Sequence, residues 1–283
     1  MKPGKTLQQF EQKHGTGRVK ELQAVVDAIA RQHRTVVLDV PTVNNSITFG
    51  LVGDSHYGSL YEAKDVAKAL YRRFAAQGIT TVFHAGDVLD GHKIYRGQEF
   101  ELHALGWAKQ RDWFTREAPL EKGITTHFIT GNHDASLKKI AGIDVGAELE
   151  HVRPDWVCLG EDIGTVTLRT PKGKTYTVML LHPDGGTAYA ISYRIQKIIE
   201  QLEGGRKPHF LGVGNFHKAE FLPSYRNIAG CQVGCLQWQT PFMVRKGLSA
   251  HVGGWIIRVT PGEFNHAVSA EFIAFYADPK GGR

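Results

Sequence analysis

The first half of the chain alternates between two patterns of hydrophobic and polar positions. Short apolar runs that end in glycine and a polar residue occur at 47–54, 79–87 and 124–134, and each predicts a buried strand. Between them, residues 60–77 and 97–118 have apolar positions three and four apart, which predicts amphipathic helices. This order of strand and helix predicts an α/β fold with a partly parallel sheet.

The second half of the chain is richer in strand patterns. Residues 165–181 predict a hairpin that turns around 171–174, and its second arm runs directly into His182. The other predicted elements are a helix at 187–203 and strands at 209–217, 253–260 and 270–277. We therefore expect two layers of sheet with helices outside them.

The N-terminal segment predicts an arm in front of the main domain. Apolar residues at helical spacing predict one amphipathic helix over residues 18–32, and residues 40–46 have the composition of a linker. We divide the chain into an arm, residues 1–45, and one domain, residues 46–283.

Composition narrows the class of protein. The chain has 283 residues, 42% of them hydrophobic, which is enough for a large core. Its formal net charge of +6 suits an anionic substrate. The three cysteines form no C-x-x-C pair, so a disulfide scaffold or zinc ribbon is not expected. Neither a long apolar run nor a signal-peptide pattern is found, so we expect a cytoplasmic protein with no membrane contact.

Five of the predicted strands end in polar residues that suit a metal ion. These residues are Asp54 and His56, Asp87, Asn132 and His133, His182, and Asn215 and His217. The ends of strands in an α/β sheet gather along one edge, where ligands usually bind. A single aspartate after glycine is usually a turn residue, but independent turns do not need this ordered set. Carboxylate, imidazole and amide ligands together favour manganese, iron or zinc over calcium.

The order of these motifs, D-x-H, GD, GNHD, H and G-x-x-H, resembles the calcineurin-like metallophosphoesterase superfamily over about Ile47 to His217. The resemblance implies a four-layer α/β/β/α sandwich of two mixed sheets flanked by helices, with two divalent metal ions, Mn²⁺ being favoured over Fe or Zn. It also implies the ligands: Asp54, His56, Asp87 and His217 for one ion, and Asp87, Asn132, His182 and Asn215 for the other.

Position 215 departs from the family pattern. The family usually has G-H-x-H at this point, with both histidines as ligands, whereas this chain has Gly214-Asn215-Phe216-His217. The asparagine carbonyl oxygen is a poorer donor to a transition metal than an imidazole nitrogen. Several alternatives stay open: Asn215 contacts the metal directly, or the second site is weak, holds a harder ion such as manganese, or lacks a direct protein ligand at this position.

The resemblance also implies the chemistry. A hydroxide that bridges the two ions attacks phosphorus, and His133, the family's catalytic histidine, protonates the leaving group or steadies the charge. Asp90 stands where the protein Ser/Thr phosphatases of the superfamily pair an aspartate with this histidine; alternatively it is a turn residue before Gly91. Other candidate phosphate contacts are His84, His92, Lys93 and Arg96.

We expect a phosphodiesterase that acts on nucleic acid, DNA or RNA, or on a nucleotide. The phosphatases continue with an arginine after Asp90, but Gly91 and His92 follow here, and residues 214–221 resemble phage and bacterial phosphoesterases akin to the repair exonucleases. Those nucleases are often dimers, so a homodimer is one expectation. The alternatives are a phosphomonoesterase, or a catalytically impaired metal-binding or partner-binding module in which Asn215 marks a decayed site.

Overall fold

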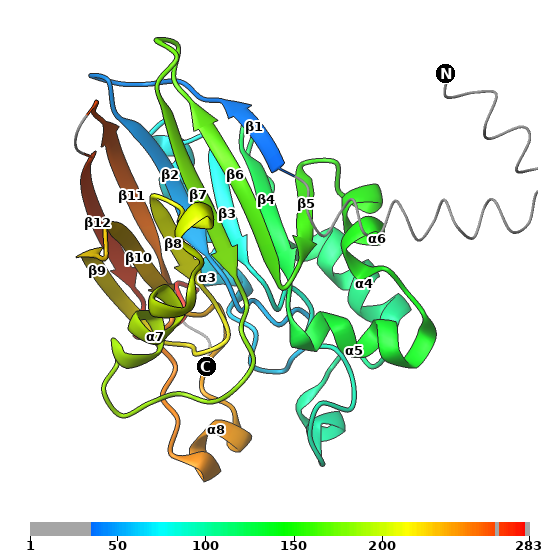
Figure 1. The fold of residues 1–283 in the computed structure, drawn as a ribbon. Helices are drawn as coiled ribbons and strands as arrows, with labels where there is room; N and C mark the ends of the chain where they lie inside the picture. Colours follow the sequence, from blue (N-terminus) through cyan, green and yellow to red (C-terminus); the bar gives the residue numbers. More distant parts are fainter. Residues whose placement is uncertain (1–34, 264–265, 281–283) are drawn as a thin grey trace, which may run out of the picture.

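The computed structural model describes residues 35–263 and 266–280 (Figure 1). The helix expected at 18–32 lies outside the described residues. Strand β1 (Thr35–Asp39) falls in the range that we assigned to the arm, and it pairs in parallel with β6, with Thr35 opposite Thr165 and Asp39 opposite Arg169.

One sheet carries most of the predicted metal ligands. Its strand order is β12-β11-β2-β3-β4-β5, in which the four strands from β2 to β5 run parallel and β11 and β12 are antiparallel to their neighbours. The strands are β2 (Ile47–Val52), β3 (Thr81–Ala85), β4 (Thr125–Thr130), β5 (Trp156–Glu161), β11 (Gly253–Pro261) and β12 (His266–Ala274). The loops after β2, β3 and β4 meet at the lower edge of the sheet in Figure 1.

The second sheet is mixed as well, with strand order β1-β6-β7-β8-β10-β9. The predicted hairpin is present as antiparallel β6 and β7, and β8 pairs in parallel with β7 and β10. The strands are β6 (Ile163–Arg169), β7 (Thr175–Leu181), β8 (Phe210–Val213), β9 (Ala219–Tyr225) and β10 (Ile228–Val233).

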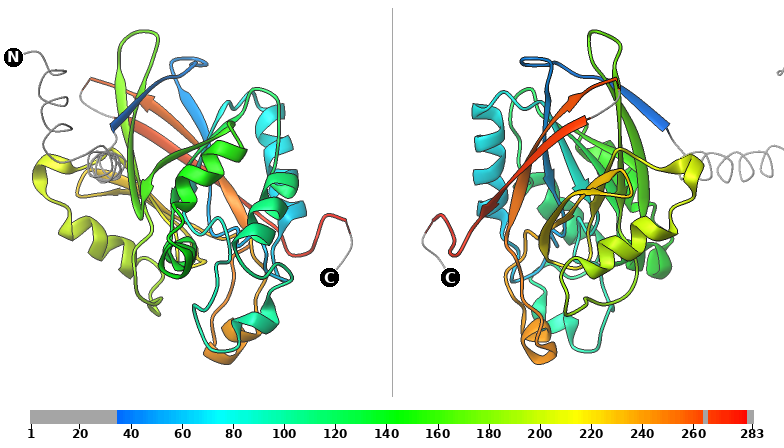
Figure 2. Two further views of the ribbon diagram at one scale, coloured as in Figure 1. Left: turned by 90° about the vertical axis from the view of Figure 1, so that its right-hand side faces the viewer. Right: turned by 60° about the vertical axis from the view of Figure 1, so that its left-hand side comes forward.

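Helices cover the outer face of each sheet (Figure 2). Residues of α3, α4, α5 and α6 pack on the first sheet and residues of α7 pack on the second. The helices are α3 (Lys64–Ala76), α4 (Trp107–Glu117), α5 (Asn132–Ala141), α6 (Val145–Val152), α7 (Tyr193–Gln201) and α8 (Pro241–Lys246), with 3₁₀ helices η1 (Gln98–Glu101) and η2 (Gly204–Arg206). Within the described part of the chain, none of these helices has the length and apolar character needed to cross a membrane.

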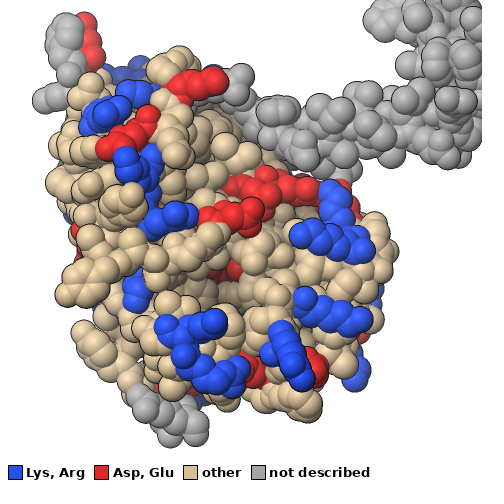
Figure 3. Space-filling model, turned by 60° about the horizontal axis from the view of Figure 1, so that its bottom comes forward, with Lys and Arg blue, Asp and Glu red and all other residues tan. Residues whose placement is uncertain are grey.

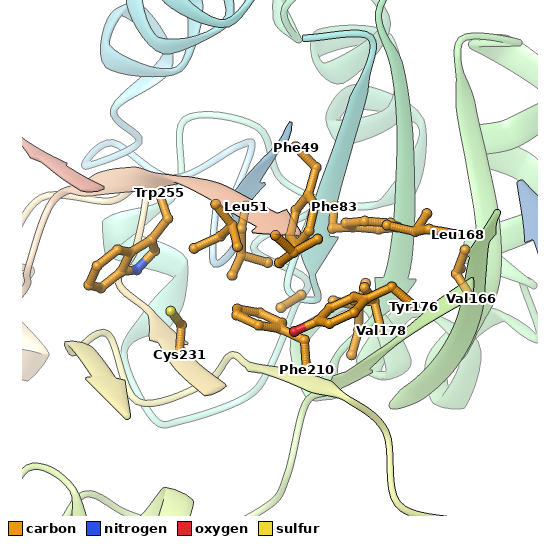
Figure 4. Packing of buried hydrophobic residues seen from close by; sticks show 14 of the residues in the cluster. Phe49, Leu51, Phe83, Val166, Leu168, Tyr176, Val178, Phe210, Cys231 and Trp255 are labelled. Atoms are coloured by element: carbon orange, nitrogen blue, oxygen red, sulfur yellow. The ribbon is translucent and has the colours of Figure 1, made fainter. Parts of the chain in front are cut away.

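The main core lies between the two sheets (Figure 4). The Phe49 ring from β2 makes edge contacts with Phe83 of β3 at 5.2 Å and with Phe210 of β8 at 5.6 Å between ring centroids. Successive residues of a strand face opposite sides, so Leu51 joins this core while Val52 packs among the residues of α3. The predicted α/β/β/α sandwich is thereby confirmed.

The helix predicted over 97–118 is divided into η1 and α4. Gly97 and Gly106 have φ angles of 93° and 84°, which an α-helix does not permit, and Gly106 caps the start of α4. The helix expected from 187 begins only at Tyr193. The hairpin of β9 and β10 was missed, although its turn has the left-handed pair Arg226 and Asn227 with φ of 51° and 65°.

Candidate metal centre

The loops after β2 and β3 continue the parallel pairing of their strands. The Asp54 N–H donates to the Gly86 carbonyl at 2.9 Å, and the His56 N–H donates to the Asp87 carbonyl at 3.1 Å. This pairing places the D-x-H residues directly beside Asp87. All three side chains are buried, with 0–2% of their surface exposed.

The loop after β4 adds a third group of ligand candidates. Helix α5 begins at Asn132, and the His133 N–H donates to Asp87 Oδ1 at 2.9 Å. A Cβ at Gly131 would collide with that same carboxylate, so glycine is needed there for the close approach. The His182 Nε2 lies 3.2 Å from Asp87 Oδ2 and 3.1 Å from Asn132 Oδ1.

The side chains form two overlapping groups with the spacing of metal ligands, and His56, Asp87 and His133 form a third such group between them. In the first, His56 Nε2 faces His217 Nε2 at 3.1 Å, and His217 Nε2 lies 3.5 Å from Asp54 Oδ1. In the second, ligand atoms of Asp54, Asp87 and His182 all lie within 4.8 Å of one another. Asp87 connects the groups, because its Oδ2 is also 3.8 Å from His56 Nε2.

The donor set fits a pair of cations. The His56 Nδ1 donates to Asp90, so the neutral ring presents a lone pair at Nε2; when His217 carries its proton on Nδ1, both facing nitrogens present lone pairs and a cation satisfies both at once. Burial lowers the pKa of His217 well below its usual value, and the neighbouring His56 adds to this effect. Burial also lowers the pKa of His182, but the Asp87 carboxylate outweighs it and raises that pKa. Positive charge is therefore favoured beside Asp87, which is where a second cation would bind.

Asn215 lies at the same centre with its side-chain nitrogen already engaged. Its Nδ2 donates to the Pro183 carbonyl at 2.6 Å and to the Gly185 carbonyl at 3.1 Å, and its backbone N–H donates to Asp54 Oδ1 at 2.9 Å. Asn215 therefore ties the loop after β7 to the loop after β2. Its amide oxygen is the one side-chain atom that remains as a candidate ligand.

Asp90 lies between two histidines and contacts one through its side chain and the other through its backbone carbonyl. Its Oδ1 accepts a hydrogen bond from His56 Nδ1 at 2.9 Å and is 3.7 Å from His133 Nδ1. The His133 Nδ1 instead donates to the Asp90 backbone carbonyl at 2.7 Å. Both acceptors are oxygen atoms, so Nδ1 of each ring carries the proton and Nε2 is left for the pocket.

Two buried glutamines and a buried aspartate complete the centre, and the sequence did not single out the glutamines. Gln98 Nε2 donates to Asp90 Oδ2 at 3.1 Å, and Gln237 Nε2 lies 3.3 Å from Asp90 Oδ1. Asp134 accepts from the N–H groups of Val88, Leu89 and Gly131 at 2.8–3.0 Å, which joins the loops after β3 and β4. No spacing relates the glutamines to Asp90, so no sequence pattern signals them.

His84, one of the candidate phosphate contacts, is excluded by its burial. It is fully buried and bonded to Ser55 Oγ, and burial lowers its pKa to about 3, with His182 adding to the shift. A neutral side chain without access to solvent does not bind a substrate phosphate. Lys93 and Arg96 are exposed near the pocket.

Five residues of the centre have left-handed backbone conformations. The φ angles are 51° for Asp54, 49° for His56, 50° for Asp87, 73° for Asn215 and 53° for His217. Such conformations cost an L-residue roughly 1–2 kcal/mol each, and they cluster at functional sites. The rest of the fold holds these loops in place.

The centre forms the floor of a pocket of about 320 Å³. The floor consists of His56, Asp87, Asp90, His133, Asn215 and His217, and the walls include Ile94, Tyr95, Phe216, Phe242, Met243 and Leu248. Figure 3 shows this face of the molecule, where Lys and Arg side chains border a recessed centre that contains acidic side chains. A charged floor thus adjoins largely apolar walls.

Comparison with protein families agrees with the motif order and the fold. The family model for calcineurin-like phosphoesterases matches residues 47–224. The chain belongs to the calcineurin-like phosphoesterase family. Membership supports metal-dependent hydrolysis of a phosphoester, and the clustered aspartate and histidine groups agree with it.

Solved structures of similar fold include proteins of different kinds. One is GAP50, "the anchor in the inner membrane complex of Plasmodium", at 11% identity and TM-score 0.47, covering 84% of this chain and 86% of that one. A predicted phosphoesterase from Streptococcus pneumoniae has 12% identity and TM-score 0.38 over 80% and 98% of the two chains. Vacuolar Protein Sorting 29 from Cryptosporidium parvum has 12% identity and TM-score 0.39 over 81% and 99%. No curated protein matches this member of the family.

Proposed function

We propose that this calcineurin-like phosphoesterase is a phosphodiesterase with two metal ions, Mn²⁺ by preference, acting on a nucleotide or nucleic acid. The observation that carries the proposal is the pocket, in which candidate metal ligands form the floor and aromatic and apolar side chains form the walls. Such walls suit the organic group of an ester next to its phosphate.

The lining of the pocket favours a diester over a monoester. Among its described lining residues there is no lysine or arginine. A monoester phosphate carries up to two negative charges on its terminal oxygens, whereas a diester carries one. A floor that offers only metal ions and imidazoles as positive charge therefore suits the less charged substrate.

We assign the metal ligands by their distances, and Asn215 by its place in the family motif. Asp54, His56 and His217 hold one cation, Asn132 and His182 with the amide oxygen of Asn215 hold the other, and Asp87 lies between them. When bound, the ions offset the charge of the phosphate and lower the pKa of water. Asp90 keeps the His56 ring oriented through its Nδ1, as outer carboxylates do for metal-binding histidines.

His133 acts on the leaving group. Its ring makes an edge contact with His56 at 4.5 Å between centroids, and its Nδ1 is fixed by the Asp90 carbonyl. The Nε2 is then directed to the pocket; with a second proton on Nε2 the ring is an imidazolium, which donates that proton to the departing oxygen and keeps the one on Nδ1. This step contributes about 10² to 10⁴ in rate in enzymes of known mechanism.

Three p-nitrophenyl esters test the proposal with one leaving group. We expect turnover with Mn²⁺ of thymidine 5′-(p-nitrophenyl) phosphate and of methyl p-nitrophenyl phosphate, both diesters, and a much lower kcat/KM for p-nitrophenyl phosphate. Preference for the monoester would replace the proposal by a phosphomonoesterase. Lack of turnover of all three with any divalent metal would indicate a module that binds metal or a partner without catalysis.

A further inference from the structure

Two segments about 140 positions apart in the sequence form a ridge beside the pocket, residues 95–101 and 241–245. The rings of Tyr95 and Phe242 stack across it with centroids 4.3 Å apart and an angle of 22°. The Tyr95 hydroxyl donates to Glu101 Oε2 at 2.7 Å, and Arg245 lies 3.8 Å from Glu101 Oε1. The ridge is therefore held together by its own contacts.

The ridge separates the pocket from a second hollow. Tyr95 and Phe242 line the catalytic pocket, whereas Arg96, Phe100 and Arg245 line the hollow on the other side, with a volume of about 520 Å³. The adjacent residues Tyr95 and Arg96 thus contribute to opposite sides. A flexible ligand that has its reacting phosphate in the pocket reaches the second hollow by crossing the stacked rings.

The second hollow combines positive charge with an exposed aromatic ring. Phe100 is 81% exposed and the Arg245 side chain is 63% exposed. Glu101 also lines the hollow, but it is only 5% exposed and its carboxylate accepts from Tyr95, so with Arg96 and Arg245 the net charge is positive. A guanidinium group suits a phosphate, and a free aromatic face suits a base.

We infer that the ridge binds single-stranded nucleic acid, with the nucleotide next to the scissile phosphate in the second hollow. Its phosphate contacts Arg96 and Arg245, and its base stacks on Phe100. The strand is single because a base in a duplex has both faces covered by its neighbours and has none to offer a side chain. This inference rests on the proposed function, since it extends the substrate of that same pocket.

Binding of fluorescein-labelled oligothymidylates, measured by anisotropy in EDTA to prevent turnover, tests the inference without catalysis. We expect the hexanucleotide to bind the wild-type protein more tightly than the dinucleotide does. In R96Q/R245Q its affinity falls about tenfold, and the slope of log affinity against log salt concentration falls by about 0.7, because the contacts to one phosphate are lost. Phe100→Ala weakens binding about fivefold, the low end for a stacked base.

A matched variant removes the same charge elsewhere. R72Q/K139Q replaces two exposed cations on α3 and α5, so we expect wild-type affinity and salt dependence. All four altered cations are exposed, and unchanged melting temperatures confirm that the variants are folded.

Three results would overturn the inference. They are R96Q/R245Q binding the hexanucleotide as the wild type does, the duplexed hexanucleotide binding as tightly as the single strand, and a hexanucleotide that binds no tighter than the dinucleotide. If one of these results is obtained while methyl p-nitrophenyl phosphate is hydrolysed, the inference fails and the proposed function stands. If the hexanucleotide binds tightly and with the expected length dependence but no diester is hydrolysed, the proposed function fails and nucleic-acid binding by the ridge stands.

Discussion

The floor of the pocket and the ridge beside it are built in opposite ways. The floor consists largely of buried acids and imidazoles, such as Asp87 and His56, whose loops are fixed by backbone hydrogen bonds between neighbouring strand ends. The ridge presents exposed side chains, such as Phe100 and Arg245, on two short segments. Under our two proposals, the reaction belongs to the floor and the choice of substrate to the ridge, so substitutions in the two parts should affect different quantities.

Asp87→Asn should have the largest effect. It removes the negative charge that lies within reach of both groups of ligands, so we expect turnover of every phosphoester to be lost, beyond the roughly 10² to 10⁴ that a proton donor contributes. The amide oxygen can still accept from the His133 N–H, which keeps the loop in place. Asp112→Asn, at an exposed side chain, is the control. Mn²⁺ binding measured by calorimetry should fall with activity; retained activity would remove Asp87 from the metal centre.

His133→Gln should have the next largest effect, and its size should depend on the leaving group. With an alkyl leaving group, which needs a proton, we expect kcat to fall by about 10² to 10⁴. With p-nitrophenolate, which leaves as a stable anion, the loss should be smaller, while Mn²⁺ binding is retained. Equal losses for the two leaving groups would show that His133 is not the proton donor.

Asn215→Ala separates two roles of the asparagine. If its amide oxygen binds the second cation, the Mn²⁺ concentration for half-maximal activity should rise by about tenfold, since loss of a supporting group costs 10- to 100-fold in affinity. If it only ties the loop of Pro183 and Gly185, the melting temperature should fall with no change in the Mn²⁺ requirement. The second result would contradict our ligand assignment.

Phe242→Leu tests the wall formed by the ridge. We expect the preference for the thymidine diester over the methyl diester, expressed as a ratio of kcat/KM values, to fall about fivefold, because a leucine offers no flat face to a base. An unchanged ratio would mean that the stacked pair of Tyr95 and Phe242 does not contact the substrate.

Gln98→Leu should have the smallest effect on activity, although it touches both parts. Gln98 donates to Asp90 in the floor and accepts from the Ile94 N–H at 2.9 Å beside the ridge. Buried groups that lose their partner cost about 1–3 kcal/mol each. We expect the melting temperature to fall by several degrees, at about 2–4 °C per kcal/mol for domains of about this size. Gln201→Leu, at an exposed helix position, should leave it unchanged.

The residues of the metal centre could be predicted from the sequence because each belongs to a short local motif. Each motif joins an apolar run, a turn and a polar residue, and the parallel order of β2, β3 and β4 then brings Asp54, Asp87 and Asn132 to one edge. The ridge could not be predicted from the sequence, because Tyr95 and Phe242 come together only through tertiary packing. The same holds for Gln237, which is 147 positions from Asp90 in the sequence, and Gln98, only eight positions away, follows a loop whose path no pattern predicted.

The left-handed backbone of the five metal-centre residues restricts how this site can be redesigned. Apart from glycine, Asp, His and Asn are the residues that adopt this conformation most readily, and each of the five positions holds one of them. Cysteine and glutamate also bind metals, but they lack this tolerance. Replacing Asp54 or His217 by cysteine to change the metal preference should therefore destabilise the backbone conformation of the loop, whatever the affinity of the thiolate for the metal.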